Sequence, residues 1–159
     1  MVRKLGILID RIETSQLILD MNVSIGEAIS KQLYDDVNVF YNNVGQNMMA
    51  SPCAYMSPAQ LHGFNGEIIA TNIATAEVAL NISKNRRFFY IWELEWLKEG
   101  VIPHYDSIAP YYNNNEFIYA TRSKSYAAIL ENNFNTKVEI ITPNFNLEKF
   151  NEYSLRCGG

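Results

Sequence analysis

Short apolar runs alternate with amphipathic stretches along the chain, a pattern typical of proteins that alternate strands and helices. The first run, Leu5 to Ile9, is continuously apolar, as expected of a central strand in a parallel sheet that is covered on both faces. In residues 17–33 apolar positions recur at intervals of three and four, which predicts a helix with one buried face. Thr14 or Ser15 can cap its first turn.

The same alternation continues to the end of the sequence, without an internal repeat or a linker that would divide it. We predict six strands, at residues 5–9, 37–41, 67–70, 87–92, 117–120 and 138–141. After the second strand we predict a loop with a short helix near 57–61, and further helices over 75–82, 123–134 and 147–153; residues 93–100 and 105–112 are helical or turn-like.

Strands separated mainly by helices require crossover connections, which make a mostly parallel sheet with helices on its faces. The sequence therefore predicts one α/β domain over residues 1–159, a Rossmann-like three-layer fold. For its six-stranded sheet we predict the order 3-2-1-4-5-6.

The amino-acid composition argues against several classes of protein. The chain has 159 residues, with 13 Lys and Arg against 17 Asp and Glu and a net charge of −4, which argues against a phosphate-tracking nucleic-acid binder. Cys53 and Cys157 follow no disulfide or metal-binding spacing, which favours a reducing compartment. The apolar run at the start ends at Asp10, too early for a signal sequence or a membrane span. We expect a cytoplasmic protein without a membrane span.

Several motifs with known chemistry are missing from the sequence. The segment after the first strand has neither the GxGxxG fingerprint nor a P-loop, which argues against a nicotinamide or flavin enzyme. No serine or cysteine lies in a GxSxG elbow. His62 and His104 lie in separate loops without a partner at metal-ligand spacing. We therefore expect no cofactor and no metal site.

Polar side chains follow most of the predicted strands, and ligands of such sheets bind beyond the carboxyl ends of the strands. These residues are the candidate ligand-binding positions: Asp10, Arg11, Thr14, Thr71, Asn72, Arg122, Ser123 and Asn144. Thr14 and Ser123 have a simpler interpretation as helix caps. Arg122 and the helix start at Ser123 would also suit an anion.

The segment from Trp92 to Trp96 holds the candidate catalytic residues, Glu93 and Glu95. In a strand the two carboxylates would share a face, whereas in a helix they would point apart and the two tryptophans would stack. The simpler interpretation is two core tryptophans and two solvated carboxylates. The functional one is a general base, or an acceptor for hydroxyl groups of a polyol.

Residues 68–150 resemble the N-terminal, acceptor-side domain of GT-B-type glycosyltransferases. The resemblance lies in four stretches, Ile68 to Asn72, Phe89 to Glu95, Tyr119 to Ser123 and Val138 to Asn144. In that family the second of these stretches is often an aromatic run that ends in an acidic residue. The last strand often leads to Pro or Asn and then Phe, as in Asn144-Phe145.

The resemblance implies a site for a sugar, a nucleotide sugar or a glycosyl acceptor. Glu93 or Glu95 would hold or deprotonate an acceptor hydroxyl, and Arg122 with Ser123 would meet phosphate or carboxylate groups. The glycine-rich loop usual after the first strand is absent, and residue 159 falls where the donor-binding domain would begin. Transfer would then need a donor-domain protein or a homo-oligomer.

Two other functions remain open at this stage. One is a non-catalytic binding or inhibitor protein on the same fold, because a fold does not fix a function. Clustered asparagines, as at 113–115, suggest an AT-rich phage or bacterial genome as its source. The other is a structural subunit that uses exposed aromatic residues as an interface.

Overall fold

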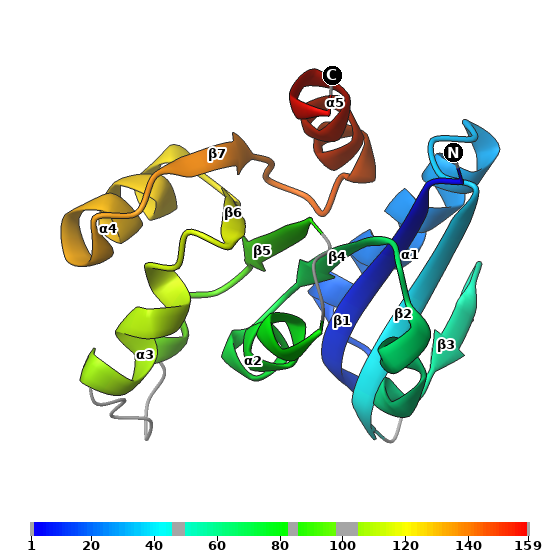
Figure 1. The fold of residues 1–159 in the computed structure, drawn as a ribbon, viewed down its shortest axis with the longest axis horizontal. Coiled ribbons are helices and arrows are strands. Elements are labelled where there is room, and N and C mark those ends of the chain that lie inside the picture. Colours follow the sequence, from blue (N-terminus) through cyan, green and yellow to red (C-terminus); the bar gives the residue numbers. More distant parts are fainter. Residues whose placement is uncertain (1, 46–49, 83–85, 98–104, 159) are drawn as a thin grey trace.

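The computed structural model describes residues 2–45, 50–82, 86–97 and 105–158. They form a single sheet of seven strands, all parallel, in the order β3-β2-β1-β4-β5-β6-β7 (Figure 1). The strands are β1 (Lys4–Ile12), β2 (Asp36–Val44), β3 (Ala54–Met56), β4 (Glu67–Ala70), β5 (Arg87–Ile91), β6 (Phe117–Thr121) and β7 (Val138–Ile141). The α/β class and the Rossmann-like architecture are confirmed.

Five α-helices and two short 3₁₀ helices accompany these strands within the described ranges; all lie between strands except α5, which follows β7. The α-helices are α1 (Gln16–Ser30), α2 (Ile73–Asn81), α3 (Tyr105–Tyr112), α4 (Lys124–Phe134) and α5 (Leu147–Cys157). The 3₁₀ helices are η1 (Pro58–Gly63) and η2 (Glu95–Leu97). Polar side chains at their N-caps explain where most of the α-helices begin: Ser15, Asn72, Ser123 and Asn146 each accept a hydrogen bond from a backbone N–H of the first turn.

Three predicted details are corrected. The sheet has seven strands rather than six, because the stretch expected as a loop contains β3, which pairs with the outer side of β2. The predicted order 3-2-1-4-5-6 is wrong for the strand at 67–70, which it places beside the strand at 37–41. The strand at 67–70 is the fourth in chain order and pairs directly with β1, while β3 takes the place beside β2. The fourth predicted strand ends at Ile91 rather than Trp92, and the last helix runs on to Cys157. Residues 98–104, which include His104 and the end of the segment predicted over 93–100, lie outside the described residues.

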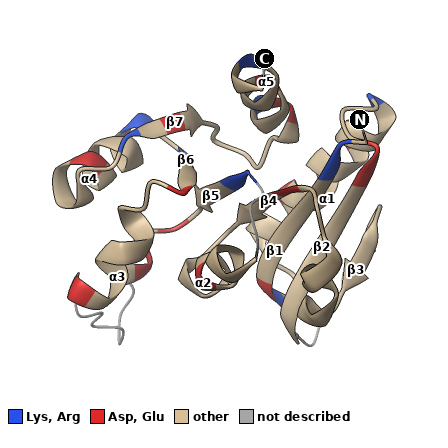
Figure 2. Cartoon of the chain, viewed as in Figure 1, with Lys and Arg blue, Asp and Glu red and all other residues tan. Residues whose placement is uncertain are grey.

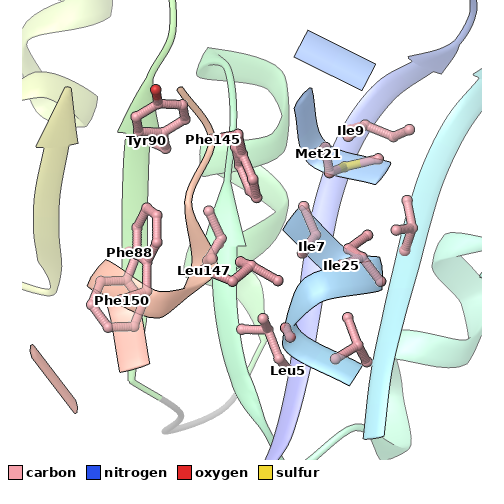
Figure 3. Close-up of a cluster of buried hydrophobic side chains, with 14 of the residues drawn as sticks. Leu5, Ile7, Ile9, Met21, Ile25, Phe88, Tyr90, Phe145, Leu147 and Phe150 are labelled. Carbon is pink, nitrogen blue, oxygen red and sulfur yellow. The ribbon is translucent and has the colours of Figure 1, made fainter. Parts of the chain in front are cut away.

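The alternation of side chains along the strands divides the core into two layers. One layer packs beneath α1 and α5 and includes Leu5, Ile7 and Ile9 of β1 with Phe88 and Tyr90 of β5 (Figure 3). The other lies beneath η1, α2, α3 and α4 and includes Leu8, Phe89 and Ile91. Helices thus cover both faces of the sheet, as the continuous apolar strands predict.

Candidate functional site

A pocket of about 490 Å³ opens at the carboxyl ends of β1, β4 and β5. The chain runs outward from β1 through β2 to β3 and then returns to β4, so β1 and β4 flank the point where the strand order reverses. In open parallel sheets this reversal is the usual place for a ligand. The pocket is lined by Asp10 and Arg11 in the last part of β1, which runs further than the predicted end at Ile9, and by Glu13 directly after it. Thr71 and Asn72 after β4, and Trp92, Glu93 and Glu95 after β5, complete this part of the lining.

The pocket gathers most of the residues that the sequence singles out. Asp10, Arg11, Thr71, Asn72, Glu93 and Glu95 all line it. Thr14 is exposed between two lining residues, Glu13 and Ser15, without lining the pocket itself. Ser123 and Asn144 follow β6 and β7 and also lie outside the pocket lining. The functional roles expected for all these residues stay predictions.

The side chains after β4 are fixed by the start of α2. The side chain of Asn72 accepts a hydrogen bond from the Thr75 N–H at 2.8 Å, and the Thr75 hydroxyl oxygen accepts one from the Asn72 N–H at 3.0 Å. This reciprocal pair is a capping box. The Thr71 hydroxyl donates to the Leu8 carbonyl at 2.8 Å and ties the end of β4 to β1. These hydrogen bonds fix the positions of Thr71 and Asn72 in the pocket lining.

The two glutamates occupy different environments. Glu95 is half-buried, and its carboxylate oxygens accept hydrogen bonds from the Ile73 N–H at 3.1 and 3.2 Å, at the N-terminus of α2. A carboxylate in this position complements the partial positive charge of the helix end. Glu93 is exposed at the pocket edge. The chain between them is neither strand nor α-helix, so neither conformation considered for the sequence holds there.

The tryptophans belong to the core, as the simpler interpretation expects. Trp92 packs in the layer beneath α1 and α5, while Trp96 packs on the other layer, with its ring 4.9 Å from that of Tyr112 and 5.1 Å from that of Phe134. Trp92 also lines the pocket, which the sequence does not predict. The Arg122 guanidinium lies 4.1 Å from its ring centroid, a cation–π contact that holds Arg122 close to the pocket.

Carboxylates outnumber cations in the pocket lining. In the described part of the lining, the carboxylates of Asp10, Glu13, Glu93 and Glu95 accompany one cation, Arg11. The Asp10 carboxylate accepts a hydrogen bond from the Asn42 amide of β2 at 3.4 Å. Such a lining offers acceptors for the hydroxyl groups of a polar ligand and opposes a phosphate group at the same place.

The two predicted positions after β6 and β7, Ser123 and Asn144, have a structural role outside the pocket. Ser123 is the N-cap of α4, and its hydroxyl oxygen accepts a hydrogen bond from the Tyr126 N–H at 3.2 Å. The carbonyl of Asn144 accepts a hydrogen bond from the Thr142 hydroxyl at 2.6 Å.

The start of α1 adds lining residues that the sequence does not single out, Gln16 and Leu17. Their place shortly after the first strand is the sequence signal by which both residues could have been added to the candidate ligand-binding positions.

In comparisons with protein-family models, with curated proteins and with solved structures, nothing matches this chain. Among the described residues, no group of three or more His, Cys, Asp or Glu side chains is placed to hold a metal ion. The described helices are all too short or too polar to cross a membrane.

Proposed function

We propose that the pocket at the ends of β1, β4 and β5 binds a glycosyl acceptor, as the acceptor half of a glycosyltransferase-like cleft. The observation that carries this proposal is the gathering of Asp10, Asn72 and Glu93 around one cavity at the reversal of the strand order. Carboxylates and amides are hydrogen-bond partners for sugar hydroxyls, and the cavity is large enough for a sugar ring. The sequence resemblance to acceptor-side domains supports the same assignment.

Glu93 is the residue we assign to the chemistry. It would accept the proton of an acceptor hydroxyl while that oxygen bonds to the anomeric carbon of the donor, and the departing nucleotide would take the electron pair of the broken bond. Glu95 would act as a positioning residue, because its carboxylate holds the N-terminus of α2 beside the site. Arg122, held over Trp92, would meet an anionic group at the pocket edge.

The donor would be held by another domain or by a second chain. The acidic lining and the absence of a glycine-rich loop after β1 both disfavour binding of a nucleoside diphosphate within the pocket itself. The residues of this pocket therefore supply recognition of the acceptor and one proton transfer.

Thermal unfolding with a panel of free sugars, nucleotide sugars and nucleotides tests the proposal. A ligand at 100 times its dissociation constant adds about 2.7 kcal/mol to the free energy of unfolding, enough to raise the midpoint by several degrees. We expect such a rise with a sugar or a sugar-bearing acceptor. Glu93→Gln should weaken it, while Glu131→Gln, an exposed glutamate on α4, should leave it unchanged.

The other outcomes are equally informative. An unchanged midpoint with every sugar would overturn the proposal. Binding that Glu93→Gln does not weaken would remove Glu93 from the site. Tight binding of a ligand that carries no sugar would instead support the non-catalytic binding protein that the sequence leaves open.

A further inference from the structure

A second pocket, of about 540 Å³, lies at the opposite end of the sheet from the first. It is formed at the starts of β1, β4 and β5 and by the last turns of α5, and in Figure 1 the N-terminus and α5 lie at this same end of the molecule. We name it the Arg3–Arg86 pocket, after the two arginines that line it with Lys4, Glu67, Ser154 and Leu155.

Positive charge is in excess in this pocket. Among the described lining residues, Arg3, Lys4 and Arg86 accompany one carboxylate, Glu67, although the whole chain has a net charge of −4. Figure 2 shows basic residues at the starts of β1 and β5 on either side of an acidic residue at the start of β4. A second carboxylate, that of Asp35, lies beside the pocket and accepts a hydrogen bond from the Arg3 backbone N–H. Two carboxylates leave part of the charge of three cations unbalanced, which favours an anion in the pocket.

Both arginines are fixed by their contacts. An Arg86 Nη atom lies 3.1 Å from a Glu67 carboxylate oxygen and donates to the Ser154 carbonyl at 3.1 Å. An Arg3 Nη atom lies 3.8 Å from the other Glu67 oxygen, and the Arg3 guanidinium lies 5.0 Å from the ring centroid of Tyr34. Arginines held in this way need little reordering to bind a ligand, which favours affinity.

Buried polar atoms in this pocket lack partners. Ser154 is only 4% exposed and lines the pocket, yet its hydroxyl has no hydrogen-bond partner among the described residues. One Nη atom of Arg3 and one carboxylate oxygen of Glu67 also lack a hydrogen-bond partner, but these two atoms form the 3.8 Å ion pair with each other. The Ser154 hydroxyl is therefore the unsatisfied group that points to a ligand, because an unsatisfied buried polar group costs free energy and a hydroxyl can donate to an oxyanion.

From these observations we infer that the Arg3–Arg86 pocket is a binding site for an oxyanion group, a phosphate or a carboxylate, carried by a small organic molecule. Arginine recognises both groups because its planar fork matches two of their oxygens. Val2 and Leu155, which are 66% and 62% exposed, border the pocket and give an apolar part of the ligand a surface to contact. The inference does not depend on the proposed function.

The test measures thermal unfolding in rising inorganic phosphate and, separately, in rising acetate, with sodium chloride added to keep the ionic strength constant. We expect a saturable rise of the midpoint with at least one of the two anions. A rise with phosphate alone assigns a phosphate ligand, and a rise with acetate alone assigns a carboxylate. No saturable rise with either anion overturns the inference.

Three variants separate binding from general salt effects. Ser154→Ala removes only the hydroxyl and should weaken the anion affinity about tenfold. Arg86→Met should abolish the saturable rise, while Lys137→Met, which removes an exposed cation elsewhere, should leave it unchanged. A rise that is equal in Ser154→Ala, Lys137→Met and the unmodified protein would reflect exclusion of the salt from the protein surface and overturn the inference. Ser154→Ala keeps the test decisive even where Arg86→Met does not fold.

Discussion

At the scale of single residues, two glycines differ in whether the structure leaves room for a side chain. A Cβ atom on Gly66 would lie 2.3 Å from the Lys4 carbonyl oxygen, where the backbone before β4 runs against β1. A Cβ atom on Gly26, within α1, would meet nothing within 4 Å. Glycine is therefore required at the first position by the close approach of two backbones. At the second position it only costs helix stability.

Alanine substitutions test this contrast. Gly66→Ala should lower the free energy of unfolding by about 1–3 kcal/mol, because the backbone must shift to admit the methyl group. Gly26→Ala should raise it by about 0.5–1 kcal/mol. Urea denaturation of the two variants beside the unmodified protein measures both changes. Shifts of the same sign in the two variants would contradict this account.

Individual site residues differ in how far the sequence predicts them. Asp10 and Thr71 are predictable, because the ends of neighbouring parallel strands share one edge of the sheet. The contact of Arg122 with Trp92 follows only from the register of β5 and β6, in which Ile91 pairs with Thr121 and brings the next residues together. The pairing register of two strands that are distant in the sequence cannot be predicted from a local sequence pattern.

At the scale of elements, α2 is held at both ends by side chains from outside it. Glu95 accepts from the backbone at its N-terminus, and Arg87 donates to the carbonyls of Ala79, at 2.8 Å, and Ile82 at its C-terminus. The signs of both charges complement the helix dipole. Arg87 is 8% exposed and also pairs with Glu116 at 2.7 Å, so it links α2, β5 and the start of β6.

Replacing Arg87 should therefore lower the free energy of unfolding much more than replacing an exposed charged residue. We expect Arg87→Met to lower the free energy of unfolding by about 3 kcal/mol, because it leaves the carbonyls of α2 without their charged donor. Lys149→Met, which removes an exposed pair with Glu152, should change it little. Equal losses in the two variants, measured by urea denaturation, would show that Arg87 does not hold the helix.

The elements that the sequence misplaces are short or lack a periodic signal. β3 has three residues, Ala54–Met56, in a stretch with little apolar alternation, and only its pairing with β2 makes it a strand. Its omission shifts the number of every later strand, although the Rossmann-like class is predicted correctly. The long helices with polar caps and spaced apolar residues, such as α1 and α4, begin within a residue or two of their predicted starts.

At the scale of the whole molecule, buried tyrosines should make the free energy of unfolding decrease at alkaline pH. Burial raises the pKa of Tyr34, Tyr90 and Tyr112 above the usual value of about 10, and it raises the pKa of Tyr119 to about 12. Below pH 10 the folded and unfolded chains both keep these protons. Between pH 10 and 12 the unfolded chain loses protons that the folded chain keeps, so unfolding becomes more favourable.

We expect the free energy of unfolding to fall steadily from pH 10 to 12. Urea denaturation at several pH values measures the fall, and absorbance at 295 nm should show the buried tyrosines ionising together with unfolding. Tyr119→Phe should make the fall shallower, although it also removes the hydrogen bond to the Tyr111 carbonyl. Stability that stays constant up to pH 12 would contradict the assigned cause.

The position of β1 at the centre of the sheet has a consequence for synthesis on the ribosome. The first strand of the chain, Lys4–Ile12, finds one neighbour in β2 but gains the other only when β4, Glu67–Ala70, has been translated. Until then a strand with a continuous apolar run, Leu5 to Ile9, has an open edge, which is the kind of surface that chaperones bind and that aggregates. The nascent chain is therefore most vulnerable until β4 has been made, and refolding should be slow, because the central pairing joins distant segments.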